Sequence, residues 1–249
     1  MSAFDAVLFD LDDTLCRHEQ SAETIYYGAF EHAGVDPVGR PTDLWEVLDG
    51  DPPPGDPTDY LADGFAQVLT GRSDSSAPVG PHDETADGSE ARAVARRLAE
   101  GFHETVDYRA VSFTPGAERA LTAARERGLV GLVTNGPASR QRVKLDALGI
   151  AEAFDVVVYA GDLPRRKPEP DPFEEALDAL DVRAGTTLYV GDSAEHDVVG
   201  AHRAGLPVAW VGGSEGWDGQ RWAGVERPTY VLERIDALSG VLDGASGTR

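Results

Sequence analysis

Short apolar runs recur along the chain and alternate with segments whose apolar residues are spaced three and four apart. The runs are typical of buried strands, and the spaced segments are typical of amphipathic helices. This alternation predicts an α/β fold with a parallel sheet and crossover helices. The predicted strands are Val7–Phe9, Leu129–Val133, Val156–Tyr159, Leu188–Val190 and Val208–Val211. The predicted helices are Pro115–Arg127, Pro137–Leu148, Pro172–Leu180 and Asp197–Ala204.

The stretch between the first two predicted strands, residues 16–112, is far longer than a single crossover helix requires. We therefore expect a second domain inserted there, with the main domain built from 1–15 and 113–249. Helical spacing at both ends of the insert predicts that it is α-helical. These ends are Ser21–His32 and Ala91–Val106, and two stretches rich in Pro, Gly, Asp and Ser, 49–59 and 73–89, are expected to be loops.

The chain is strongly acidic: 44 Asp and Glu against 22 Lys and Arg give a formal net charge of -22 in 249 residues. Such a surface repels nucleic acid and anionic membranes, so neither is expected as a partner. No apolar run approaches the ~20 residues that span a bilayer, and no secretion signal is recognised. The single cysteine, Cys16, excludes an intramolecular disulfide. A cytoplasmic location is expected, and the oligomeric state is not predicted.

Basic residues are used unevenly, with 20 arginines and only two lysines, Lys144 and Lys167. We interpret this usage and the acidic surface as halophilic, an adaptation to a salt-rich cytoplasm. At molar salt the Debye length shrinks to roughly 3 Å, which screens repulsion among surface carboxylates. The alternative is an acidic protein from a GC-rich genome without adaptation to salt.

Two acids, Asp10 and Asp12, follow the first predicted strand directly. In extended backbone, side chains two positions apart point to the same side. At the carboxyl edge of a sheet such a pair needs a cation or hydrogen-bond donors, which makes a divalent metal a natural partner. Taken alone, the pair is also compatible with an acidic surface turn.

Polar residues also follow the second and third predicted strands. Thr134 and Asn135 offer a hydroxyl and an amide, and Pro137 suits a helix start whose free backbone amides can hold a phosphate. Taken alone, this segment is also compatible with an ordinary helix start. Lys167, in the loop after Val156–Tyr159, uses lysine where the chain otherwise chooses arginine. This favours a role for a compact ammonium over chance placement.

The fourth predicted strand is followed by Gly191 and Asp192, and Asp197 comes five residues later. Glycine permits the close approach of another group, and Asp192 at the strand tip is a candidate metal ligand. Asp197 is also compatible with a favourable acidic charge at a helix start.

Together these signals resemble the haloacid dehalogenase superfamily. They are Asp-x-Asp-x-Thr after the first strand, Thr-Asn-Gly after the second, Lys-Pro after the third, and Gly-Asp with a further Asp after the fourth. All four motifs of the superfamily are matched. The resemblance implies a Rossmann-like parallel sheet core with an inserted α-helical cap domain of the first type.

The resemblance also implies an activity, the Mg²⁺-dependent hydrolysis of a small phosphorylated metabolite. Asp10 matches the nucleophile that forms an aspartyl-phosphate, and Asp12 matches the acid that protonates the leaving alkoxide and later deprotonates water. Dehalogenases lack the second acid, so Asp12 favours phosphoryl transfer. Two alternatives stay open: a sugar-phosphate mutase, and a non-catalytic protein of this fold that binds a phosphorylated metabolite.

The other matches concern phosphate and metal binding. Thr134 and Lys167 match phosphate-binding positions, and Asn135 is a further candidate. The implied Mg²⁺ ligands are Asp10, the backbone carbonyl of Asp12, and Asp192, with Asp197 as a supporting acid.

Adaptation to salt predicts a measurable response of stability. We expect the melting temperature to rise between low salt and about 2 M KCl, because the added ions screen repulsion among surface carboxylates. Thermal unfolding in a series of KCl concentrations measures this. A constant or falling melting temperature would favour the GC-rich alternative.

Overall fold

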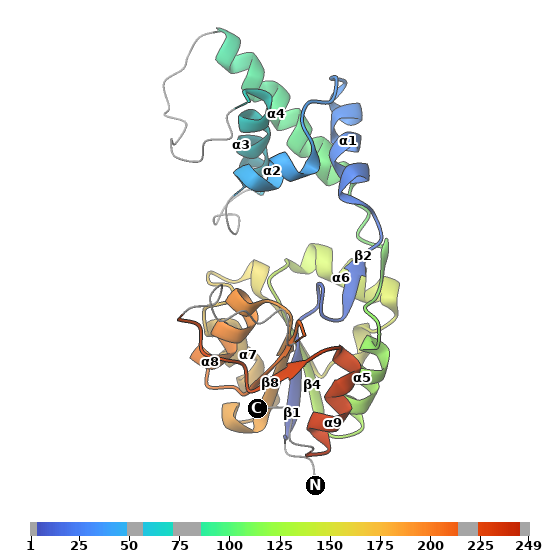
Figure 1. Cartoon of the computed structure of the whole chain (residues 1–249), viewed down its shortest axis with the longest axis vertical. Helices are drawn as coiled ribbons and strands as arrows, with labels where there is room; N and C mark the ends of the chain where they lie inside the picture. Colours follow the sequence, from blue (N-terminus) through green and yellow to red (C-terminus); the bar gives the residue numbers. More distant parts are fainter. Residues whose placement is uncertain (1–3, 49–56, 72–85, 214–223, 245–249) are drawn as a thin grey trace. The chain divides into compact units, whose positions relative to one another are not determined.

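The computed structural model describes residues 4–48, 57–71, 86–213 and 224–244 (Figure 1). The chain divides into two units. The core unit comprises 1–19 and 108–249, and the helical unit comprises 20–107.

The core unit is built on a six-stranded parallel sheet with the strand order β5-β4-β1-β6-β7-β8. Five of its strands lie within one residue of the predicted ones, so the predicted α/β fold with a Rossmann-like parallel sheet is confirmed. The sequence pattern missed β8, which has only three residues. The strands are β1 Ala6–Phe9, β4 Leu129–Thr134, β5 Val156–Tyr159, β6 Thr187–Gly191, β7 Val208–Val211 and β8 Tyr230–Leu232.

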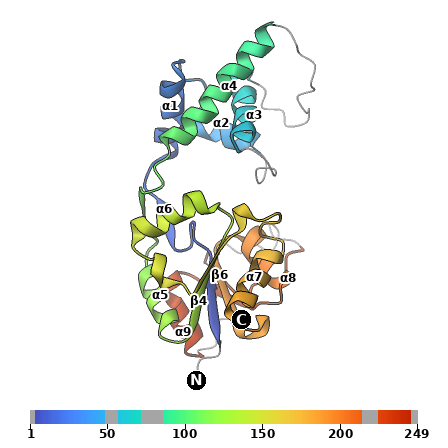
Figure 2. The same ribbon diagram turned by 180° about the vertical axis from the view of Figure 1, so that it is seen from behind.

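Helices cover both faces of this sheet (Figures 1 and 2). β1 is buried throughout, as expected for a central strand of a parallel sheet. Because side chains alternate along a strand, Phe9 packs into one hydrophobic cluster and Leu8 into the other. The first cluster includes residues of α5 (Ala117–Arg125), α6 (Ala138–Leu148) and α9 (Leu238–Leu242); the second includes residues of α7 (Asp171–Leu180) and α8 (Val199–Arg203).

A two-stranded antiparallel ribbon stands where the chain leaves and re-enters the core unit. Its strands are β2, Cys16–His18, and β3, Val111–Phe113. This pairing ties residues 16–19 and 108–112 to the core unit, so the helical unit begins and ends inside the predicted insert, 16–112. Three-residue strands give too little alternation to be recognised in a sequence.

The helical unit contains four described helices that enclose an apolar core of their own. Phe30, Phe65 and Leu98 are fully buried in it. The helices are α1 Ala22–Ala33, α2 Pro41–Val47, α3 Pro57–Leu69 and α4 Ala86–Thr105. Across the described residues, no helix is both long and apolar enough to cross a bilayer.

The two predicted loops of the insert lie mostly outside the described residues. Their last residues, 57–59 and 86–89, belong to α3 and α4, so the prediction was wrong there. Proline and acidic residues indicate loops, but they are also favoured in the first turn of a helix.

The buried sheet makes a prediction about stability. Leu132 of β4 is fully buried, whereas Leu129 of the same strand is 38% exposed. We expect Leu132→Ala to lower the free energy of unfolding by about 2–5 kcal/mol through lost burial and the cavity left behind. The matched variant Leu129→Ala should cost less than about 1 kcal/mol. Urea denaturation followed by circular dichroism measures both, and equal losses would contradict the described register.

Candidate active site

The central position of β1 brings three strand ends together. β1 pairs with β4 on one side and β6 on the other, all in parallel. Asp10, Thr134 and Asp192 therefore lie at neighbouring carboxyl ends of the sheet. The chain runs from β1 outward through β4 and β5 and then returns to β6, so this is the topological switch point where ligands bind in open α/β sheets.

Three acids meet at this edge. One carboxylate oxygen each from Asp10, Asp192 and Asp197 lies within 4.8 Å of the others. Asp197 belongs to a π-helical turn, Ala194–Val198, that precedes α8, and its Oδ2 accepts the backbone N–H of Ser193 at 2.9 Å. A Cβ at Gly191 would collide with the Asp197 carboxylate, so the expected need for glycine there is confirmed.

Lys167 supplies the positive charge among these acids. Its Nζ lies 2.7 Å from Asp10 Oδ1 and 2.8 Å from Asp197 Oδ1, and it donates to the Tyr189 hydroxyl at 2.9 Å. The side chain is only 2% exposed. Burial works to lower the pKa of Lys167, but the two carboxylates outweigh burial and raise the pKa. The lysine therefore stays charged in a buried acidic site.

The acids carry an electrostatic cost despite this lysine. Burial raises the pKa of Asp10 well above its ordinary value, with Lys167 opposing the rise and Asp197 adding to it. Burial also raises the pKa of Asp192 to about 6, with a hydrogen bond from Thr14 opposing. A divalent cation relieves this cost, and three carboxylates form the oxygen donor set that Mg²⁺ and Ca²⁺ prefer. The donor set therefore fits a metal.

Three residues that the sequence analysis gave no role support the acids. Thr14 Oγ1 donates to Asp192 Oδ1 at 2.7 Å, and Trp210 Nε1 donates to the Asp192 carbonyl at 2.6 Å. Tyr189, whose hydroxyl lies 3.0 Å from Asp197 Oδ1, joins the same network. Thr14 is the threonine of Asp-x-Asp-x-Thr, so the motif could have indicated its role. Tyr189 and Trp210 cannot be distinguished from ordinary core residues in the sequence.

Asn135 connects two of the predicted site segments. Its side-chain amide donates to the Lys167 carbonyl at 3.0 Å and accepts the Lys167 backbone N–H at 2.9 Å. The loop after β4 therefore fixes the loop that carries Lys167. A direct contact of Asn135 with phosphate stays a prediction.

The start of α6 differs from expectation. Pro137 is the residue before the helix, and the first backbone N–H of α6, at Ala138, is taken by Asp162 Oδ2 at 2.9 Å. The Ala138 amide is therefore not free, because an acid from the turn after β5 reaches it. Phosphate binding by the other amides at this helix start stays a prediction. The buried Thr134 hydroxyl remains at the strand end as expected.

Asp12 lies in different surroundings from Asp10. Its carboxylate contacts Lys144 Nζ at 2.6 Å and Gln141 Nε2 at 2.8 Å, and its side chain is not part of the three-acid cluster. The expected metal contact of its backbone carbonyl stays a prediction. Neither Gln141 nor Lys144 is among the predicted site residues, although the scarcity of lysine that singled out Lys167 applies equally to Lys144.

The arrangement has the parts that phosphoryl transfer requires. A buried carboxylate stands at the centre, a metal-type acid cluster and an ammonium lie beside it, and a second, half-exposed carboxylate lies two residues away. Positive charge can offset the negative charge of a phosphate, and a carboxylate can act as nucleophile or as acid and base.

Comparisons with known sequences agree with this geometry. Residues 4–205 match the family model described as haloacid dehalogenase-like hydrolase. The chain is 40% identical over 129 residues to the phosphoserine phosphatase of Thermus thermophilus, a match that covers 51% of this chain and only 50% of that protein. It is 33% identical over 204 residues to the phosphoglycolate phosphatase of Cereibacter sphaeroides, covering 82% of this chain and 83% of that protein.

Solved structures agree on the fold. The HAD-hydrolase YfnB of Bacillus subtilis has a TM-score of 0.65 and 21% identity, over 96% of this chain and 99% of that one. The family match covers most of the chain. This chain belongs to the haloacid dehalogenase-like hydrolase family.

Proposed function

We propose that the protein is a Mg²⁺-dependent phosphatase that hydrolyses a small-molecule phosphate monoester through an aspartyl-phosphate on Asp10. The observation that carries this proposal is the Asp10 carboxylate, which is buried at the tip of β1, 2.7 Å from Lys167 and within the three-acid cluster. Two relatives, named phosphoserine phosphatase and phosphoglycolate phosphatase, support phosphate esters as the substrate class.

The first half of the reaction transfers the phosphoryl group. Asp10 attacks phosphorus, the bond from phosphorus to the ester oxygen breaks, and Asp12 gives its proton to the departing alkoxide. Lys167 offsets the negative charge of the phosphoryl oxygens, and the Thr134 hydroxyl donates to one of them. The products are an acyl phosphate on Asp10 and an alcohol.

The second half regenerates the enzyme. Asp12, now ionised, removes a proton from a water molecule that attacks the same phosphorus. The bond between phosphorus and the Asp10 oxygen breaks, which releases inorganic phosphate. Dividing the reaction in this way lets one carboxylate serve as acid and then as base.

Mg²⁺ would be held by Asp10 and Asp192, with Asp197 as a supporting acid and the Asp12 carbonyl as a further candidate ligand. When bound, Mg²⁺ neutralises phosphoryl oxygens and orients them for in-line attack. Gly191 leaves room for the Asp197 carboxylate beside this site, and Thr14 donates a hydrogen bond to Asp192.

The proposal includes a role for the helical unit as a cap that selects the alcohol part of the substrate. The names of the two relatives put phosphoserine and phosphoglycolate first in a substrate panel, with sugar phosphates and nucleotides after them. A mutase would isomerise a sugar phosphate faster than it releases phosphate, and a binding protein would release none.

The decisive variant is Asp10→Asn, which removes the nucleophile while preserving its shape. We expect phosphate release from p-nitrophenyl phosphate in Mg²⁺ to fall on the order of 10⁴-fold or more. Asp13→Asn is the matched control, because Asp13 is exposed and has a φ of 59°, which asparagine also tolerates. Turnover that survives Asp10→Asn would remove Asp10 from its proposed role.

A second prediction concerns the metal site. At pH 8 we expect Mg²⁺ to raise the melting temperature of the wild type by several degrees, because a ligand stabilises the state that binds it. Asp192→Asn should lose this response. A Mg²⁺ shift that persists in Asp192→Asn would contradict the assignment of Asp192.

The same variant tests the electrostatic cost of the site. The raised pKa of Asp192 means that folding disfavours its ionised form. Without metal, Asp192→Asn should therefore melt above the wild type at pH 8, and its advantage should shrink as the pH falls through about 6. Thermal scans in EDTA between pH 8 and pH about 4 measure this.

A further inference from the structure

Lys144 is a buried cation beside Asp12 that the proposed mechanism does not yet use. Its side chain is 6% exposed, and its Nζ lies 2.6 Å from Asp12 Oδ1. Burying an ammonium is costly unless a partner compensates for lost hydration. Within the described residues, the ion pair found for Lys144 is the one with Asp12. The Asp12 carboxylate therefore compensates the buried Lys144 ammonium, and the ammonium in turn holds one oxygen of that carboxylate.

Gln141 holds the other oxygen of the same carboxylate. Its Nε2 donates to Asp12 Oδ2 at 2.8 Å and to Thr134 Oγ1 at 2.6 Å. The ionised Asp12 of the ion pair with Lys144 only accepts, so in this state the amide nitrogen faces Asp12, and its two protons serve these two contacts. Since Thr134 Oγ1 accepts from Gln141, its own proton remains available for a phosphoryl oxygen. One amide thus orients two proposed site groups.

A third contact comes from the ribbon strand β2. Cys16 Sγ lies 3.9 Å from Asp12 Oδ1. Burial raises the pKa of Cys16 to about 12, with Asp12 adding to the rise, so the group is a neutral thiol that donates. Asp12 is therefore held from α6 and from β2, while 41% of its side chain stays exposed.

We infer that Lys144 and Gln141 are positioning residues, which fix the carboxylate of Asp12 in the orientation that proton transfer to the leaving group and from water requires. This inference rests on the proposed function. A half-exposed aspartate would otherwise sample several rotamers, and misplacing a reacting group by about 1 Å can cost on the order of 10²-fold in rate.

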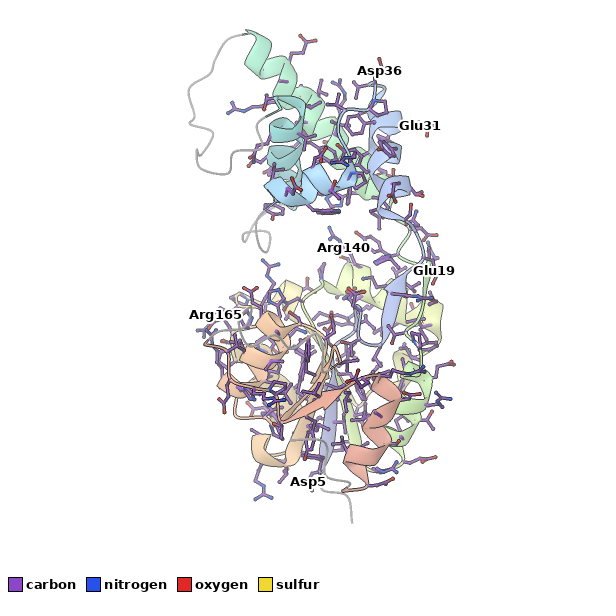
Figure 3. All side chains as sticks on the ribbon, in the orientation of Figure 1. Asp5, Glu19, Glu31, Asp36, Arg140 and Arg165 are labelled. Carbon is purple, nitrogen blue, oxygen red and sulfur yellow. The ribbon has the colours of Figure 1, made fainter. Side chains whose placement is uncertain are left out.

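The choice of lysine supports a role beyond packing. The chain uses arginine at all but two basic positions, and the two lysines contact the two acids of the Asp-x-Asp pair. A compact ammonium can hold one carboxylate oxygen in a buried space, whereas a guanidinium fork tends to engage both. Lys144 and Arg140 both lie over the Tyr108 ring, and Arg142 lies over the Tyr159 ring, but of these three cations only Lys144 has an ion pair with Asp12 among the described residues (Arg140 is labelled in Figure 3).

Substrates with different leaving groups test the inference. Phosphoglycolate and phosphoserine release an alkoxide, which needs a proton, whereas p-nitrophenyl phosphate releases a stable phenolate that does not. We expect Lys144→Met to lower kcat/KM for the alkyl ester by about 10- to 100-fold and for the aryl ester by less than about threefold. In Gln141→Leu, too, kcat/KM for the aryl ester divided by kcat/KM for the alkyl ester should rise at least about tenfold.

The second half-reaction gives an independent readout. Because a misplaced Asp12 activates water poorly, Lys144→Met should release p-nitrophenolate in a burst that approaches one equivalent of enzyme before a slow steady state. Asp12→Asn combined with Lys144→Met should be no slower than Asp12→Asn alone, since Lys144 acts through Asp12. A further loss in the double variant would overturn the inference.

Arg142→Met is the matched control, because it removes the same charge from an exposed position of α6. It should leave both kcat/KM values unchanged. Equal losses for the two esters in Lys144→Met, or no loss for either, would overturn the inference while leaving the proposed phosphatase intact. A wild type that hydrolyses neither ester would overturn the proposed function, and the inference with it.

Discussion

The buried ion pair between Lys167 and Asp10 is the interaction on which the active edge of the sheet depends. Three carboxylates converge within a few ångströms at the end of β1 and β6, and burial disfavours the ionised forms of Asp10 and Asp192 by raising the pKa of each. The ammonium of Lys167 offsets part of this cost without filling the site. Its own position is set by Asn135, which binds its backbone on both sides, and by Tyr189 at its tip.

The two acids of the Asp-x-Asp pair have different electrostatic surroundings, although they are only two residues apart in the chain. Asp10 is buried and faces Lys167 and the other acids, while Asp12 is half-exposed and faces Lys144 and Gln141. Different environments give identical side chains different chemistry, which is how one site can contain both a nucleophile and an acid–base group. A cation from the loop after β5 serves the first acid, and a cation from α6 serves the second.

The parallel sheet could be predicted from the sequence because buried central strands such as Ala6–Phe9 and Leu129–Thr134 are continuous apolar runs. The short ribbon strands could not be predicted, since pairing over three residues depends on contacts between distant segments. At the site, positions at strand ends indicated Asp10 and Asp192, and the scarcity of lysine indicated Lys167. It could not show that Asp197 is buried against Lys167, nor that Lys144, 132 residues beyond Asp12 in the chain, reaches that carboxylate.

The ribbon formed by β2 and β3 has a consequence for how such chains diversify. Because Cys16–His18 pairs with Val111–Phe113, the chain leaves and re-enters the core unit at adjacent points. An insertion closed at its base in this way adds little entropy cost when it lengthens, about 0.6 kcal/mol for each doubling of a flexible loop. The helical segment can thus be enlarged, shortened or exchanged while the sheet edge that carries Asp10 keeps its register, so under the proposed function new substrate ranges can arise without rebuilding the chemistry.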